Sequence, residues 1–213
     1  DILIDLAGHT ANNRLALFAG RAAPVQATWL GYFGTTGLKA MDYILADRFV
    51  VPRGEEALFS ETVWRLPDSY VCFSPPDVNV PILARPAGEL VLGCFNNWSK
   101  VSDSAVRLWA QILSENPGSR LLLKTKFLDS PEVRLDAIER FTRHGITPDR
   151  LILEGPCART ELLASYNRVD IALDPFPYGG GTTTAEALWM GVPVVTLRGN
   201  RWVGRVSESI LAT

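Results

Sequence analysis

One segment carries most of the fold information in this sequence: Asp174-Pro-Phe-Pro-Tyr-Gly-Gly-Gly-Thr-Thr-Thr-Ala-Glu-Ala-Leu188. The apolar run 171–173 before it indicates a buried strand, and residues 185–190 indicate a helix. Three glycines between them lack Cβ atoms, so the backbone there can approach a ligand closely. The three threonines that follow supply hydroxyl and N–H groups at a helix start, where an anion is favoured. The segment therefore predicts a strand–loop–helix unit that holds a nucleotide diphosphate.

The candidate ligand groups of this unit are Gly180, Gly181, Thr182, Thr183 and Thr184. Glu186, one turn further on, is placed to accept hydrogen bonds from a ribose. The alternative is a glycine-rich turn with threonine caps and no ligand. The segment lacks the Gly-Lys-Ser/Thr ending of a P-loop and the Gly-x-Gly-x-x-Gly dinucleotide pattern, which points away from ATP hydrolysis and NAD chemistry.

Composition places the chain among ordinary soluble proteins. Its 213 residues suffice for one large or two small domains, with 47% apolar and 21% charged residues. A net charge of −2 predicts neither a nucleic-acid partner nor a membrane partner. No apolar run reaches the roughly 20 residues of a membrane span. Three widely spaced cysteines, Cys72, Cys94 and Cys157, favour a reducing, cytoplasmic setting and show no metal-ligand pattern.

The sequence of the first part of the chain predicts short strands with irregular connections. We expect strands at 2–6, 25–30, 43–46 and 63–66, and a short helix from Asn12 or Asn13 to Ala19. Residues 31–37 form a glycine-punctuated loop, which is either a ligand or acceptor contact or a flexible turn. The chain opens directly in an apolar run at Asp1 and stops in what reads as a helix, so we expect a fragment of a longer protein.

A proline-rich segment divides the sequence. Five prolines lie between Pro67 and Pro86, a density that excludes regular helix and suits an interdomain linker. We therefore expect a first domain at 1–75, a linker at 76–87 and a second domain at 88–213 that is truncated at its end.

The second domain shows alternating strands and helices. Strands are expected at 89–95, 120–123, 151–153, 171–173 and 192–196, and helices at 104–113, 131–144 and 159–167. This alternation predicts an α/β fold with a parallel sheet covered on both faces. Ligands of such sheets bind outside the carboxyl ends of the strands.

Several polar residues lie at such strand ends. Lys100, in the segment Phe95-Asn-Asn-Trp-Ser-Lys100, can neutralise a diphosphate leaving group, and Asn97 can bond a phosphate or sugar. The alternative for Lys100 is a solvated lysine before a helix. His9 follows the first strand and is either a site residue or structural. Arg205 is either a phosphate contact or a surface charge, and Asp174 is expected to bond N–H groups of its own loop.

Five motifs occur in an order that resembles one known family. They are Asp1-Ile-Leu-Ile-Asp-Leu-Ala-Gly-His-Thr-Ala-Asn-Asn13, Ala23-Pro-Val-Gln-Ala-Thr-Trp-Leu-Gly-Tyr32, Phe95-Asn-Asn-Trp-Ser-Lys100, Asp174-Pro-Phe-Pro-Tyr178 and Gly191-Val-Pro-Val-Val-Thr196. Together they resemble the catalytic region of the protein O-GlcNAc transferase family, which includes SPINDLY-type protein O-fucosyltransferases and bacterial relatives. The resemblance covers essentially the whole chain.

The resemblance implies a GT-B fold, in which two Rossmann-like domains face a cleft, with the N-terminal half incomplete here. It implies inverting, metal-independent and cofactor-free transfer of a sugar from a nucleotide donor to Ser or Thr hydroxyls of an acceptor protein. It also implies tetratricopeptide repeats upstream. By the same resemblance Lys100 contacts the donor diphosphate, Asn97 is a polar donor-site residue, Thr182 and Thr183 contact phosphate, and Glu186 contacts the ribose. Lys100 and His9 are the predicted catalytic residues.

Three positions depart from the family pattern. The O-GlcNAc branch has a histidine where Asp1 stands. Many relatives have a nucleotide-contacting histidine where Leu162 stands, and the loop at Phe33 usually has a proline. The base and the sugar therefore stay open between UDP-GlcNAc, which we favour, and GDP-fucose. Two readings of other kinds are a non-catalytic module that binds a nucleotide sugar or peptide, and a sugar-nucleotide epimerase.

Overall fold

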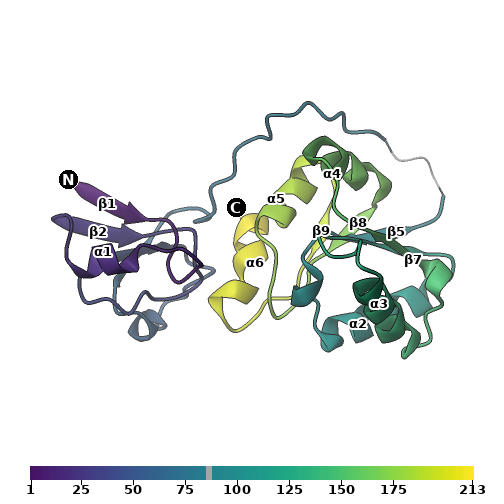
Figure 1. Ribbon diagram of the computed structural model, residues 1–213, viewed down its shortest axis with the longest axis horizontal. Helices are drawn as coiled ribbons and strands as arrows, with labels where there is room; N and C mark the ends of the chain where they lie inside the picture. Colours follow the sequence, from purple (N-terminus) through teal and green to yellow (C-terminus); the bar gives the residue numbers. More distant parts are fainter. Residues whose placement is uncertain (85–87) are drawn as a thin grey trace. The chain divides into compact units, whose positions relative to one another are not determined.

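The computed structural model describes residues 1–84 and 88–213, which separate into two compact units. Unit 1 comprises residues 1–72 and 198–213, and unit 2 comprises residues 73–197. Residues 85–87 of the expected linker 76–87 lie outside the described residues. Each unit contains a parallel sheet (Figure 1), which confirms the expected α/β class.

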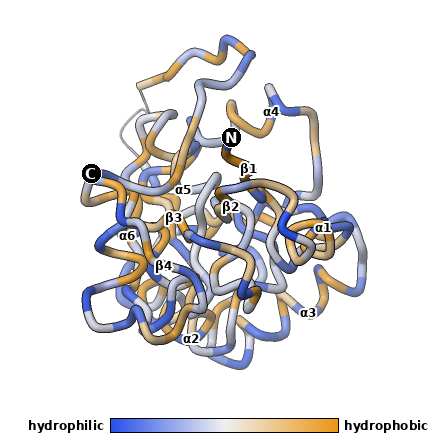
Figure 2. Tube along the Cα trace, turned by 90° about the vertical axis from the view of Figure 1, so that its left-hand side faces the viewer, coloured by the Kyte–Doolittle hydropathy of each residue, from blue (hydrophilic) through white to orange (hydrophobic). Residues whose placement is uncertain are grey.

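Unit 1 is built on a four-stranded parallel sheet in the order β1-β2-β3-β4. Its elements are β1 (Ile2–Asp5), α1 (Leu15–Ala19), β2 (Val25–Thr28), β3 (Tyr43–Ala46), the 3-10 turn η1 (Glu56–Leu58), β4 (Thr62–Arg65), η5 (Trp202–Gly204) and α6 (Val206–Leu211). The apolar strand β1 stands out in the hydropathy colouring of Figure 2. Helix α1 begins later than expected, because Asn12 has a φ of 61° and so cannot start a right-handed helix.

The last residues of the chain group with unit 1, whereas the sequence assigned them to the second domain. The reason is their packing: Trp202 and Val206 join the apolar cluster of Ile44, Val50 and Tyr70. Arg205 is only 4% exposed and pairs with Glu55 at 2.7 Å. The alternative of a surface charge for Arg205 is therefore wrong, and the phosphate contact stays a prediction.

Unit 2 is a doubly wound sheet of five parallel strands in the order β7-β6-β5-β8-β9. Its elements are β5 (Val91–Cys94), η2 (Trp98–Lys100), α2 (Asp103–Glu115), β6 (Arg120–Lys124), α3 (Pro131–Thr142), η3 (Pro148–Arg150), β7 (Leu151–Glu154), α4 (Arg159–Ser165), η4 (Tyr166–Arg168), β8 (Ile171–Leu173), α5 (Thr182–Trp189) and β9 (Val194–Val195). The helices cover both faces of this sheet (Figure 1).

Alternation along the strands of unit 2 creates one apolar cluster on each face. Leu121 and Leu123 of β6 point to the side of α2 and α3, where they meet Trp109 and Phe141. Leu122 lies between them in sequence and points to the side of α4 and α5. Burying both faces of a parallel sheet in this way fixes the strand order and thereby the position of every loop at its carboxyl edge.

Candidate functional site

The site of unit 2 lies where the chain reverses its direction across the sheet. Strand β5 pairs with β6 on one side and with β8 on the other, so the connections leave β5 and β8 in opposite directions. This is the topological switch point, and the crevice outside the carboxyl ends of two such strands is where doubly wound sheets bind ligands. Two of the predicted segments, 95–100 after β5 and 174–184 after β8, meet at this edge.

Asp174 organises the glycine loop that follows β8. Its carboxylate is 4% exposed; Oδ1 accepts from the Gly180 N–H at 2.6 Å, and Oδ2 accepts from Thr196 Oγ1 at 2.8 Å. A Cβ on Gly180 would lie 2.6 Å from Thr183 Oγ1 and 2.9 Å from Asp174 Oδ1. The loop therefore needs glycine at this position, and the expectation that Asp174 bonds its own loop is confirmed.

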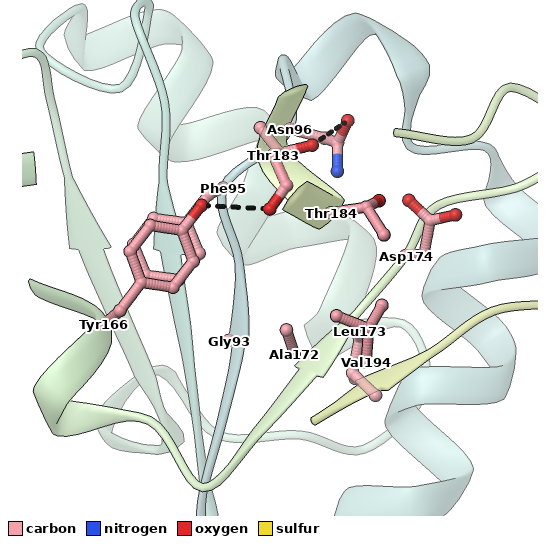
Figure 3. Close-up of a pocket in the computed structure, with 10 residues that line it drawn as sticks. All are labelled: Gly93, Phe95, Asn96, Tyr166, Ala172, Leu173, Asp174, Thr183, Thr184 and Val194. Carbon is pink, nitrogen blue, oxygen red and sulfur yellow. Dashed lines mark hydrogen bonds between the residues drawn. The ribbon is translucent and has the colours of Figure 1, made fainter. Parts of the chain in front are cut away.

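Helix α5 begins at Thr182, three residues before the start expected from its apolar residues. Its N-cap is Gly181, and no side chain forms a cap hydrogen bond. Thr182 is exposed, whereas Thr184 is only 2% exposed. The Thr183 hydroxyl lies between them and donates to Asn96 Oδ1 at 3.2 Å (Figure 3). An eight-residue helix that starts at the switch point without a side-chain cap offers backbone N–H groups and the positive end of its dipole to an anion.

Lys100 contacts the same loop from the other strand end. The side chain is half-buried; Nζ donates to the Gly179 carbonyl at 3.4 Å and lies 4.2 Å from the centre of the Tyr178 ring. Burial lowers the pKa of Lys100 below its ordinary value, and the nearby Asp174 carboxylate opposes this shift. The structure thus brings Lys100 and the glycine loop together, so Lys100 is not fully solvated; its contact with a donor diphosphate stays a prediction.

Asn97 lies further along the carboxyl edge. Its side chain caps η2 by accepting from the Ser99 N–H at 3.2 Å. It also lines a cavity of about 270 Å³ over the ends of β5, β6 and β7, whose other walls include Phe95, Lys124, Thr125, Lys126, Cys157 and Leu162. Small-molecule sites commonly measure about 300–1,000 Å³, so this cavity matches part of a ligand such as a nucleoside.

A second, much smaller cavity lies beneath the threonines (Figure 3). It measures about 10 Å³ and is lined by Gly93, Asn96, Tyr166 and Asp174, among others. This volume holds about one water molecule. Of these two cavities, the one beside Asn97 is thus large enough for part of a ligand, and the small cavity lies beneath the loop.

Glu186 is held by protein groups on the inner side of α5. It is 3% exposed; Oε1 accepts from Arg159 Nη1 at 2.5 Å, and Oε2 lies 3.4 Å from the Tyr166 hydroxyl. The same hydroxyl is 3.3 Å from the Thr183 carbonyl, and burial raises the pKa of Tyr166, so it stays protonated as a donor. The contact of Glu186 with a ribose remains a prediction. In this structure its charged partner is Arg159.

Three basic residues at this edge were missed by the sequence analysis. Lys124 ends β6, Lys126 follows it, and Arg159 opens α4 after the loop of β7. Lys124 is 6% exposed and pairs with Glu154 at 3.0 Å. The pKa of Glu154 is lowered to about 2, chiefly by the Arg168 guanidinium and also by Lys124. Lys100 was selected because it is a basic residue near the carboxyl end of a predicted strand. The same criterion would have selected Lys124, Lys126 and Arg159.

His9 belongs to unit 1. It follows β1 and is exposed; its Nε2 lies 3.1 Å from the Thr36 carbonyl oxygen, and its ring packs edge-on to Tyr32 at 5.2 Å. The catalytic role of His9 stays a prediction.

The described residues form neither a metal-ligand cluster nor a membrane-spanning helix. Within the part of the chain that the structure describes, no three His, Cys, Asp or Glu side chains gather as a metal site requires. Among residues 1–84 and 88–213, no helix is both long and apolar enough to cross a membrane.

Comparison with known proteins gives consistent matches. The sequence model of glycosyl transferase family 41 matches residues 1–74 and 82–213. The chain is 40% identical, over its whole length, to the probable UDP-N-acetylglucosamine–peptide N-acetylglucosaminyltransferase SPINDLY of Petunia hybrida, and 31% identical to the SEC protein of Arabidopsis thaliana, which carries the same enzyme name. It spans 23% of the length of each of these curated relatives.

A solved structure agrees with these matches. The structure of a mutant Thermobaculum terrenum O-GlcNAc transferase superposes with a TM-score of 0.93 and 45% sequence identity. The match covers 100% of this chain and 41% of that one. The fold class expected from the sequence, that of this transferase family, is thereby confirmed.

Proposed function

The chain belongs to glycosyl transferase family 41, and we propose that it is part of the catalytic region of an enzyme that transfers a sugar from a nucleotide donor to Ser or Thr hydroxyls of proteins. UDP-GlcNAc is the favoured donor, because the curated relatives are named as UDP-N-acetylglucosamine–peptide transferases. Transfer proceeds with inversion and requires neither a metal nor a cofactor. The acceptor is a protein or peptide, presented by upstream tetratricopeptide repeats.

The observation that carries this proposal is the contact of Lys100 with Gly179, in the glycine loop that leads into α5 at the switch point. When the bond between the sugar and the diphosphate breaks, negative charge accumulates on the leaving diphosphate. The ammonium of Lys100 and the N–H groups of α5 meet this charge from two strand ends. Charged and dipolar groups that are already in place stabilise such a transition state without reorganising.

The neighbouring cavity fits the other end of the donor. With the diphosphate at the start of α5, the nucleoside occupies the space of about 270 Å³ beside Asn97 and Leu162. GDP-fucose is the second candidate donor, supported by Asp1 and the Gly8-His9-Thr10 sequence. Both donors share the diphosphate contacts and differ at the base and the sugar.

Replacement of both Thr182 and Thr183 by alanine tests the threonine contacts. We expect the affinity for UDP or GDP to fall by at least about tenfold, because each hydroxyl lost to a charged phosphate is worth about 1.5–3 kcal/mol. Calorimetric titration of the nucleotide measures the change. Thr142→Ala, an exposed position at the end of α3, is the matched control. If the folded double variant binds the nucleotide with unaltered affinity, the threonines do not contact it, and the segment is a glycine-rich turn without a ligand.

A further inference from the structure

A buried lysine of unit 2 lies in the wall of the cavity beside Asn97. Lys124 ends β6, is 6% exposed and lines this space of about 270 Å³. It follows Leu122 by two residues, so its side chain leaves the sheet on the side of α4 and α5. Phe95 and Leu162 pack on that side and form apolar walls of the same cavity. The cavity therefore combines apolar walls with one buried positive charge.

The ammonium of Lys124 has more hydrogen-bond donors than the surrounding protein uses. It carries three N–H groups. Among residues 1–84 and 88–213, Nζ has one acceptor, Glu154 Oε2 at 3.0 Å. Glu154 lies opposite Lys124 in the β6–β7 pair, and two guanidinium nitrogens of Arg168 donate to it, each at 2.7 Å. The ion pair thus holds the ammonium in place while two of its N–H groups stay available to a ligand.

The next residue places an acceptor in the same wall. Thr125 is 8% exposed and lines the cavity. Its backbone groups bond to Glu154 and Leu128, whereas its hydroxyl has no hydrogen-bond partner among the described residues. A hydroxyl can accept as well as donate. Because buried polar groups nearly always have a partner, the ammonium and this hydroxyl together point to a polar ligand in the cavity.

The edge of a base that fits these two groups is a carbonyl next to a ring N–H. The ammonium only donates, so it needs an oxygen acceptor, and the hydroxyl can accept from the neighbouring N–H. Uracil has this edge at O4 and N3, and guanine has it at O6 and N1. Cytosine and adenine carry an amino group and an unprotonated nitrogen in these places, so two donors would face each other at the ammonium.

We propose that Lys124 and Thr125 read the base of the nucleotide and select uracil or guanine against cytosine or adenine. This role rests on the proposed function, in which the nucleoside occupies this cavity. Phe95 and Leu162 supply apolar contact to the ring, which does not distinguish one base from another. The selection acts on the edge that UDP and GDP share, so it holds for both candidate donors.

Calorimetric titration of UDP and of CDP into the intact protein tests the reading of the base, because the two nucleotides differ only at this edge. We expect UDP to bind at least about tenfold more tightly than CDP, since cytosine leaves a buried charged donor without its acceptor. In Lys124→Met, which keeps the apolar stem, the two affinities should lie within about threefold of each other, through weaker binding of UDP. Thr125→Val removes only the hydroxyl and should also reduce the preference for UDP.

The matched control is Lys126→Met, which removes an exposed lysine from the wall of the same cavity. It should leave the ratio of the two affinities unchanged. Lys124→Gln is the second variant if Lys124→Met does not fold. Its amide can donate to uracil or accept from the amino group of cytosine, so it should lose the preference as well.

The outcomes separate this role from the proposed function. An unchanged ratio in Lys124→Met, or an equal loss in Lys126→Met, overturns the role of Lys124, and an unchanged ratio in Thr125→Val overturns that of Thr125. Equal binding of UDP and CDP to the unmodified protein overturns the reading of the base and leaves the nucleotide site in place. If the protein prefers GDP, inosine diphosphate and ADP, which differ at the same edge, replace UDP and CDP with the same expected ratios. Binding of no nucleoside diphosphate overturns the proposed function together with this inference.

Discussion

We expect Lys100→Ala to lower the turnover of the intact protein by at least about tenfold, because one charge contact in a preorganised site is worth several kcal/mol in the transition state. The ammonium already contacts the Gly179 carbonyl and the Tyr178 ring. In the proposed reaction it would therefore meet the charge of the leaving diphosphate without reorganising. Steady-state kinetics at saturating donor measures the loss. Lys100→Met keeps the aliphatic stem and should lose turnover to a similar degree.

The matched control is Lys39→Ala, which removes an exposed lysine of unit 1. Its turnover should stay close to that of the unmodified enzyme, which would show that the loss follows the position of the charge. Unchanged turnover in Lys100→Ala would remove Lys100 from the mechanism.

Asp174→Asn has the second large effect, because it acts on the loop and on Lys100 together. The amide nitrogen cannot accept a hydrogen bond, so either the Gly180 N–H or the Thr196 hydroxyl loses its partner. The carboxylate also raises the pKa of Lys100 against the effect of burial, so its loss disfavours the charged ammonium. We expect both donor affinity and turnover to fall by at least about tenfold, since a hydrogen bond to a charged group is worth about 1.5–3 kcal/mol.

Calorimetry and kinetics on the same preparation check this result, and a thermal melt shows whether the fold is retained. Asp68→Asn, at an exposed position of unit 1, is the control for the chemical change. A folded Asp174→Asn variant with normal donor affinity would mean that the loop does not depend on this carboxylate.

Local sequence patterns predicted strands well where apolar runs were bounded by turn residues. Strands β3 and β8 lie at the expected residues. Strand β9 is shorter than expected, at Val194–Val195, because Pro193 has no N–H to donate to a ladder. Trp189 is large and apolar and is nevertheless 47% exposed, since it lies on the outer side of α5. These differences arise from single residues that override a broader pattern.

The candidate site could be predicted only in part, because its composition depends on the order of the strands. Lys100 and the glycine loop were found from their positions after apolar runs. That they meet follows from the pairing of β5 with β8, which no local pattern specifies. The same holds for Arg159, which reaches Glu186 from a different helix, and for Arg205, whose partner Glu55 is 150 residues away in sequence.

Calorimetric titration of UDP, GDP and their sugar conjugates into the intact protein tests the central claim most directly. We expect a nucleotide diphosphate to bind, UDP more tightly than GDP, and binding to weaken in Asp174→Asn. A preference for GDP would keep the diphosphate site and transfer the donor assignment to GDP-fucose. Binding of neither nucleotide to the folded protein would contradict the assignment of Lys100 and the start of α5 as a donor site.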